Sequence, residues 1–130
     1  MTVYGTFNNS SDRNAKQNFA PVNASEILGK VLRLPLSEWS YKADAATRHI
    51  GPMGQDFYSI FEIGTDEKHI APIDEGGVAL AAIQGLNQKL EEKLREQEAE
   101  SKTKNERIAA LEASIAELKE AMSRLLAERR

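Results

Sequence analysis

The C-terminal part of the sequence carries a heptad hydrophobic repeat that runs from Val78 to the end of the chain. After Gly85 this segment contains neither glycine nor proline, and helix-forming residues dominate it. With Ile108 at heptad position a, the a and d positions are Leu80, Ile83, Asn87, Leu90, Leu94, Gln97, Ser101, Lys104, Ile108, Leu111, Ile115, Leu118, Met122 and Leu125. Most are apolar and the register does not slip, which predicts one continuous helix in a left-handed coiled coil.

A helix of this length cannot bury its apolar seam against the rest of its own chain. At about 1.5 Å per residue it extends over roughly 75 Å, whereas the preceding residues suffice for a compact unit only about 25 Å across. Other copies of the same chain must therefore cover the seam. Two pairs of residues at positions g and e, Lys93 with Glu98 and Arg107 with Glu112, attract each other when parallel chains are in register.

The heptads leave the number of strands open. Ile at a with Leu at d, and the buried Asn87, favour two strands, whereas Ile83 at a d position favours three. The polar layers at Gln97, Ser101 and Lys104 indicate a weak middle of the coiled coil, or a helix that folds back on itself. Because no turn residues occur there, the continuous helix is the favoured interpretation.

Composition excludes several classes of function. The net charge is −3 with both signs interspersed, so no basic surface for a nucleic-acid backbone is expected. The chain has no cysteine, which excludes disulfides and thiolate metal sites. Its longest apolar run, residues 78–83, is far shorter than the roughly 20 residues that span a membrane. We expect no nucleic acid, membrane, metal or cofactor as a partner.

Residues 11–77 are expected to form one small unit, which gives the chain an α+β fold class. Asn23 and Glu26 predict a capped helix that Pro35 ends. Residues 37–42 and 48–51 predict a β-hairpin around a turn at 43–47, with Trp39 and Tyr41 on one face.

Further elements are expected on either side of this hairpin. Residues 54–64 predict a short helix that Gly64 ends, and residues 68–74 resemble a last edge strand. Residues 2–7 have strand composition but no partner, which suggests the end of an upstream segment of a longer polypeptide. The core of the small unit is expected to contain Trp39, Tyr41, Phe57, Tyr58 and Phe61; a carbohydrate platform is the alternative interpretation of these aromatic residues.

Three separated motifs carry a resemblance to a known family. They are SSDRNAKQNFAPV at 10–22, HIGPMGQDF at 49–57 and DEGGVALAAIQGLNQKL at 74–90, followed by a coiled coil. In this order they resemble the intramolecular chaperone domain of endosialidases and phage tail fibres, also called the peptidase S74 family.

The resemblance implies a C-terminal domain that assembles as a homotrimer, templates folding of an upstream β-rich fibre of the same polypeptide, and then cuts itself off. It implies cleavage between Ser10 and Ser11, with Ser11 as the nucleophile and Lys16 as its base. Residues 1–10 would then end the upstream fibre or stalk, residues 11–77 would form the self-cleaving unit, and residues 78–130 the coiled-coil helix. The implied location is a phage tail fibre or spike precursor, or a bacterial prophage or cell-surface protein, with release after cleavage.

The chemistry of serine and lysine accounts for this pair independently. A serine hydroxyl is a poor nucleophile until a base removes its proton, and lysine can be that base only where burial lowers its pKa from about 10.4 towards neutrality. A trimer interface could supply such burial for Lys16, which leads to the hypothesis that assembly gates cleavage. Taken without the motifs, Ser11 and Lys16 would indicate only a solvated turn.

Other polar residues are candidates for supporting roles. Asp12, with Arg13, is expected to hold the turn, and Gln55 or backbone amides could donate to the oxyanion. His49 could assist as a second base, or be a structural residue of the hairpin.

The sequence also contains a cluster of acidic residues before the long helix. This cluster, which comprises Asp66, Glu67, His69, Asp74 and Glu75, matches no metal-ligand spacing and is explained by the helix that follows it.

The alternative to a self-cleaving chaperone is a non-cleaving trimerisation or capping module of a fibre or surface protein.

Overall fold

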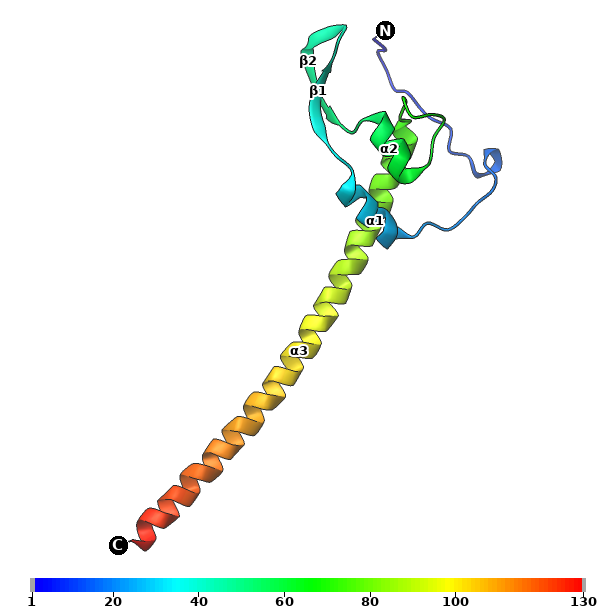
Figure 1. Cartoon of the computed structure of the whole chain (residues 1–130). Coiled ribbons are helices and arrows are strands. Elements are labelled where there is room, and N and C mark those ends of the chain that lie inside the picture. Colours follow the sequence, from blue (N-terminus) through cyan, green and yellow to red (C-terminus); the bar gives the residue numbers. More distant parts are fainter. Residues whose placement is uncertain (1, 130) are drawn as a thin grey trace. The chain divides into compact units, whose positions relative to one another are not determined.

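The computed structural model describes residues 2–129, and Figure 1 shows their arrangement in short helices, one hairpin and a long C-terminal helix. The elements in chain order are η1 (Arg13–Ala15), α1 (Ala24–Arg33), β1 (Ser37–Tyr41), β2 (Asp44–Gly51), α2 (Gly54–Phe61) and α3 (Pro72–Glu128). The predicted α+β class is confirmed. The chain divides into two compact units, the first ending at Gln88 and the second beginning at Lys89.

Helix α1 begins where the sequence predicts. Asn23 is its N-cap, and the side-chain oxygen of Asn23 accepts a hydrogen bond from the Glu26 amide at 3.1 Å. This bond satisfies one of the amides that a helix N-terminus leaves free. The helix ends at Arg33, and Leu34 is its C-cap directly before Pro35.

The hairpin differs from the prediction in the length of its turn. Only Lys42 and Ala43 form the turn, and β2 already begins at Asp44, so the expected turn at 43–47 is wrong. Tyr41 pairs with Asp44 directly next to the turn, and Trp39 pairs with His49. Because a two-residue connection is sufficient for antiparallel strands, β2 can begin directly after Ala43. The register shifts between Trp39 and Tyr41, where β2 has more residues than β1.

The expected edge strand at 68–74 is also wrong, because α3 begins at Pro72. Proline fits the first position of a helix, since its missing amide hydrogen would find no partner there. Asp74 and Glu75 fall in the first helical turn, where the helix dipole favours acidic side chains. Helix α2 ends at Phe61 rather than at Gly64, with Glu62 in the left-handed conformation at φ 54°.

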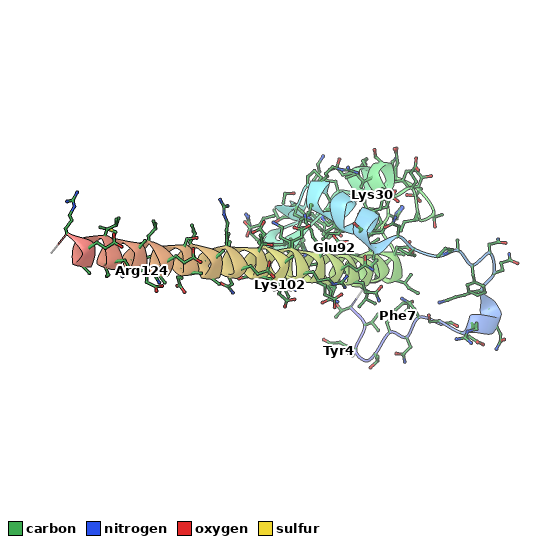
Figure 2. The ribbon with its side chains drawn as sticks, turned by 90° about the horizontal axis from the view of Figure 1, so that it is seen from below. Tyr4, Phe7, Lys30, Glu92, Lys102 and Arg124 are labelled. Carbon is green, nitrogen blue, oxygen red and sulfur yellow. The ribbon has the colours of Figure 1, made fainter. Side chains whose placement is uncertain are left out.

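The N-terminal residues 2–7 are not a strand in this chain. Within the described residues the sheet has two strands, β1 and β2, and neither pairs with this segment. Tyr4 and Phe7 are exposed there, as Figure 2 shows. A strand needs a partner for its backbone groups, and no strand formed by residues 2–129 pairs with this segment.

The core of the first unit lies between the three α-helices. Phe57, Phe61 and Val78 form its buried centre, and the rings of Phe57 and Phe61 lie 4.8 Å apart. Half-buried apolar residues that pack around this centre are Ile27, Val31, Leu34, Ile60 and Ile70. Tyr41 and Tyr58, which the sequence places in the core, are exposed instead.

The first turns of α3 have two apolar faces. Val78, Ala82 and Gly85 are buried, whereas Leu80 and Ile83 of the heptad seam are exposed. At about 3.6 residues per turn these two sets lie on nearly opposite sides of the helix. One face therefore packs in the small unit, while the seam stays uncovered within a single chain.

Gly85 permits the close packing of α1 on α3. A methyl group at Gly85 would collide with the carbonyl oxygen of Ala24 and would lie 3.0 Å from the Cβ atom of Leu28. A residue with a side chain cannot occupy this position without moving α1.

The second unit is the remainder of α3. The helix continues without a break through the polar residues Gln97, Ser101 and Lys104, so no fold-back occurs there. The Thr103 hydroxyl donates to the Ala99 carbonyl at 3.0 Å within this stretch. The apolar seam residues from Leu90 to Leu125 are exposed in the single chain.

Substitution of Gly85 tests the packing of α1. We expect Gly85→Ala to weaken the docking of α1 by about 1–3 kcal/mol, because overpacking forces the backbone to shift. Gly77→Ala is the matched control, since a methyl group there meets no atom within 4 Å and alanine favours a helix by about 1 kcal/mol. Hydrogen–deuterium exchange of α1 amides measures the effect, and equal protection in both variants would contradict the interpretation.

Candidate functional site

The motif at the N-terminal end of the first unit folds into a local turn around η1. Asp12 is the N-cap of η1, and its Oδ1 accepts hydrogen bonds from the Asn14 amide at 3.0 Å and from Asn14 Nδ2 at 3.2 Å. The Lys16 amide closes the turn on the Arg13 carbonyl at 3.3 Å. Short-range bonds of this kind need no tertiary contact, so the turn is encoded by its own sequence.

This turn brings together the two residues of the predicted dyad. Lys16 Nζ donates a hydrogen bond to Ser11 Oγ at 2.6 Å. The distance is within the reach that a base needs to take a proton from a nucleophile. A protonated amine donates in this contact, so catalysis requires a neutral amine that accepts the hydroxyl proton instead.

The surroundings of the pair are open to water. Ser11 and Lys16 are both exposed in the single chain. None of the ion pairs found among residues 2–129 involves Lys16. The single chain thus provides the proximity of the two groups, but not the dry environment that favours an uncharged amine.

The other predicted support residues lie in the hairpin and in α2. His49 on β2 stacks against Trp39, with ring centroids 4.8 Å apart, and contacts the Tyr41 ring at 5.4 Å. Gln55 lies in the first turn of α2. No hydrogen bond among the described residues joins His49 or Gln55 to the dyad, and their supporting roles stay predictions.

Gln55 lines an open groove beside the hairpin. Trp39, Tyr41, Lys68 and Glu75 contribute to the same groove. The indole Nε1 of Trp39 is buried and has no hydrogen-bond partner in the described structure. Reasoning from the sequence missed this groove, because it combines residues from the hairpin, α2 and α3 that share no pattern.

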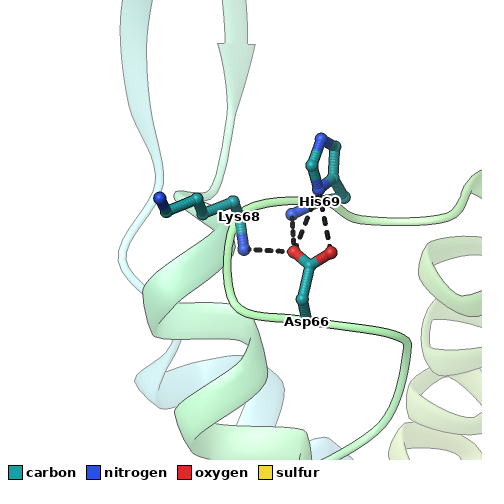
Figure 3. Close-up of polar contacts among 3 residues, drawn as sticks. All are labelled: Asp66, Lys68 and His69. Atoms are coloured by element: carbon teal, nitrogen blue, oxygen red, sulfur yellow. Dashed lines mark hydrogen bonds and ion pairs between the residues drawn. The ribbon is translucent and has the colours of Figure 1, made fainter.

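Two members of the acidic cluster, Asp66 and His69, form a second local turn, which Figure 3 shows. Asp66 Oδ1 accepts hydrogen bonds from the amides of Lys68, at 2.7 Å, and His69, at 3.0 Å. His69 Nδ1 lies 2.9 Å from the same oxygen. The hydrogen bond from the His69 ring, followed by that from the Lys68 amide, lowers the pKa of Asp66 from its usual 3.8.

This turn also supports α2. A methyl group at Gly54 would lie 2.6 Å from the Glu67 carbonyl oxygen, so the start of α2 and the turn are in close contact. Among the residues that the structure describes, no group of His, Cys, Asp and Glu side chains is arranged to hold a metal ion.

Comparison with known proteins identifies the family that these residues resemble. Residues 11–63 match the model of the family described as chaperone of endosialidase, peptidase S74. No curated protein matches the chain. The resemblance predicted from the motifs is thereby confirmed over these residues, and it supports an intramolecular chaperone role. In the described part of the chain, no helix has the length and apolar character needed to cross a bilayer.

The Asp66 turn gives a prediction on pH. Because the pKa of this carboxyl is lowered in the folded chain, the ionised form stabilises the turn above the usual value of 3.8 and this stabilisation is lost as pH falls through the folded-state pKa. The protection of the Lys68 and His69 amides against exchange, measured by NMR relative to the intrinsic exchange rate at each pH, is expected to fall in that range. In Asp66→Asn the protection should not change with pH in this way, and an Asp66 carboxyl that titrates above 3.8 would refute the prediction.

Proposed function

We propose that this chain is an intramolecular chaperone module that assembles as a trimer through α3 and releases itself by autoproteolysis between Ser10 and Ser11. The observation that carries the proposal is the 2.6 Å contact between Lys16 Nζ and Ser11 Oγ. The family match begins at the same serine, which would be the first residue after cleavage. The start of the matched residues therefore supports Ser11 as the first residue of the released module.

The exposed seam of α3 supports assembly. A continuous helix from Pro72 to Glu128 presents apolar residues at the a and d positions to water along most of its length. Burying one such side chain stabilises an assembly by about 1.5–3 kcal/mol, so the whole seam offers a large driving force. Three strands follow from the family resemblance, and the g-to-e ion pairs favour parallel chains.

The proposed reaction is a transfer of the peptide acyl group followed by hydrolysis. Lys16 takes the proton of the Ser11 hydroxyl, and Ser11 Oγ attacks the carbonyl carbon of Ser10. The bond from this carbon to the Ser11 nitrogen breaks, and that nitrogen receives the proton and becomes an amine. Water then hydrolyses the ester between Ser10 and Ser11 Oγ, which yields the Ser10 carboxyl group and restores the hydroxyl.

Assembly would control this reaction by changing the protonation of the Lys16 amine. In a single chain the loop is exposed, so Lys16 is in contact with water. Contact with neighbouring copies would remove that water and favour the neutral amine. The chain would then cut only after it has aligned its copies.

Such a sequence of events fits a chaperone that acts once. The client would be a β-rich fibre on the N-terminal side of Ser11 in the same polypeptide, as in a tail fibre, a spike or a bacterial surface protein. Once three modules are joined in register, their three client segments meet within one assembly and need no slow encounter of separate chains. Release of the module then leaves a fibre that is kinetically hard to unfold, since the template is gone.

Substitutions in the dyad test the chemistry. Ser11→Ala and Lys16→Arg are each expected to slow the appearance of a fragment that begins at Ser11 by roughly a thousandfold or more. Arginine keeps the charge and the donor but does not deprotonate in proteins. Ser10→Ala is the matched control and should be processed normally. Intact-mass spectrometry measures the products, and a fragment that persists in Ser11→Ala would leave the non-cleaving trimerisation module as the better account.

Substitutions in the seam test the coupling to assembly. We expect Ile108→Glu with Ile115→Glu to yield single chains and to abolish processing, because charged residues at two a positions cannot be buried in the bundle. Ala109→Glu with Ala116→Glu places the same charges on the outer face and should preserve both properties. Light scattering gives the number of chains, and processing at an unchanged rate by single chains would rule out gating by assembly.

A further inference from the structure

The segment between the dyad and α1 has an unusual exposure of apolar side chains. Phe19 is 71% exposed and Val22 is 67% exposed, although both lie close in sequence to the buried Ala24. Asn18 adopts a left-handed conformation with φ 58°, and Pro21 restricts the backbone further. Because the segment is already restrained, packing it against a surface costs little further backbone entropy.

The far end of this segment is fixed on α3. Asn23 caps α1, and the Ala24 carbonyl lies against Gly85 so closely that a methyl group would not fit. Residues 17–22 therefore join α1 at the level of Gly85, on the face of α3 opposite Leu80 and Ile83. Residues 17–22 can span at most about 20 Å when fully extended, whereas packed helices lie about 8–10 Å apart. A helix of an adjacent copy is within their reach.

Leu86 provides an apolar surface at this level. It is 57% exposed and occupies position g, where coiled coils usually carry charged residues. By the heptad rule its partner on the neighbouring chain is Glu91, whose two methylene groups offer less apolar surface than a leucine needs to be fully covered. The bundle alone therefore leaves Leu86 in contact with water, beside the point at which residues 17–22 leave their own helix.

We propose that residues 17–22 of one copy dock on α3 of an adjacent copy, with Phe19 and Val22 covering Leu86 of that second chain. This inference rests on the proposed function and identifies the regulation of the same site. Lys16 directly precedes the docked segment, so docking holds the Ser11–Lys16 loop against the neighbouring chain and excludes water from it. Phe19 and Val22 are then positioning residues that couple assembly to cleavage.

Crosslinking between two different chains tests the contact directly. The native sequence has no cysteine, so introduced thiols are the only ones present. Chains with Phe19→Cys are co-expressed with chains of a different length that carry Leu86→Cys, and the mixed assemblies are oxidised. A disulfide between the two lengths is expected on a non-reducing gel, because its formation needs Cα atoms within about 7 Å. Leu36→Cys, paired with the same Leu86→Cys chain, is the control and should give no such band.

Kinetics tests the consequence of docking. Phe19→Ser with Val22→Ser should still form trimers, since the seam is intact, but should be processed at least about tenfold more slowly, a factor that corresponds to about 1.4 kcal/mol. Leu36→Ser removes a side chain that is 66% exposed outside the segment and should leave the rate unchanged.

The outcomes separate this inference from the function on which it rests. If the native chain does not form trimers, or is not processed in a Ser11-dependent way, the proposed function fails. If it does both, but the mixed chains give no crosslink or the Phe19 and Val22 variant is processed at the native rate, only the docking of residues 17–22 is refuted.

Discussion

The small unit and the proposed assembly both depend on the two opposite apolar faces at the start of α3. One face, at Val78, Ala82 and Gly85, is buried within the chain, and the other begins the heptad seam at Leu80. Because the faces do not overlap, the unit can complete its core before any other copy is present. The proposed assembly would then add burial without displacing any contact of the core. The missing side chain at Gly85 lets α1 approach the helix closely enough to make this division possible.

The proximity of Ser11 and Lys16 depends on local contacts, whereas the charge of the lysine amine depends on its wider surroundings. Bonds within the turn, from Asn14 to Asp12 and from Lys16 to Arg13, are sufficient to bring the lysine amine to the Ser11 hydroxyl. Proximity is thus a property of a few consecutive residues. The charge state of an amine depends instead on how much water surrounds it, which no short segment controls. On the proposed function, the chain would carry a preformed but inactive pair through synthesis and folding.

Much of this structure could be predicted from sequence wherever the signal is local or periodic. The Asn23 cap and the unbroken helix through Gln97 follow from side-chain chemistry and from the heptad spacing. The expected edge strand at 68–74 is wrong because its proline is compatible with two kinds of secondary structure. Pro72 is compatible with an edge strand and with the first helical turn, and the core contact of Val78 with Phe57 decides between them. The groove at Trp39 is unpredictable for another reason, because it joins three elements with no shared pattern.

The exposure of the Ser11–Lys16 loop has a consequence for the order of events. A cleavage site that became active in a single chain would separate the module from its client before any alignment, and the template would be lost. On the proposed function, assembly must therefore reach the loop, and the chain connects the loop to α1 through residues 17–22, which end at the Asn23 cap beside Gly85. Any influence of assembly must act on that segment or on the loop itself. On the proposed function, the exposed side chains of Phe19 and Val22 are therefore the part of the chain best placed to make release depend on alignment.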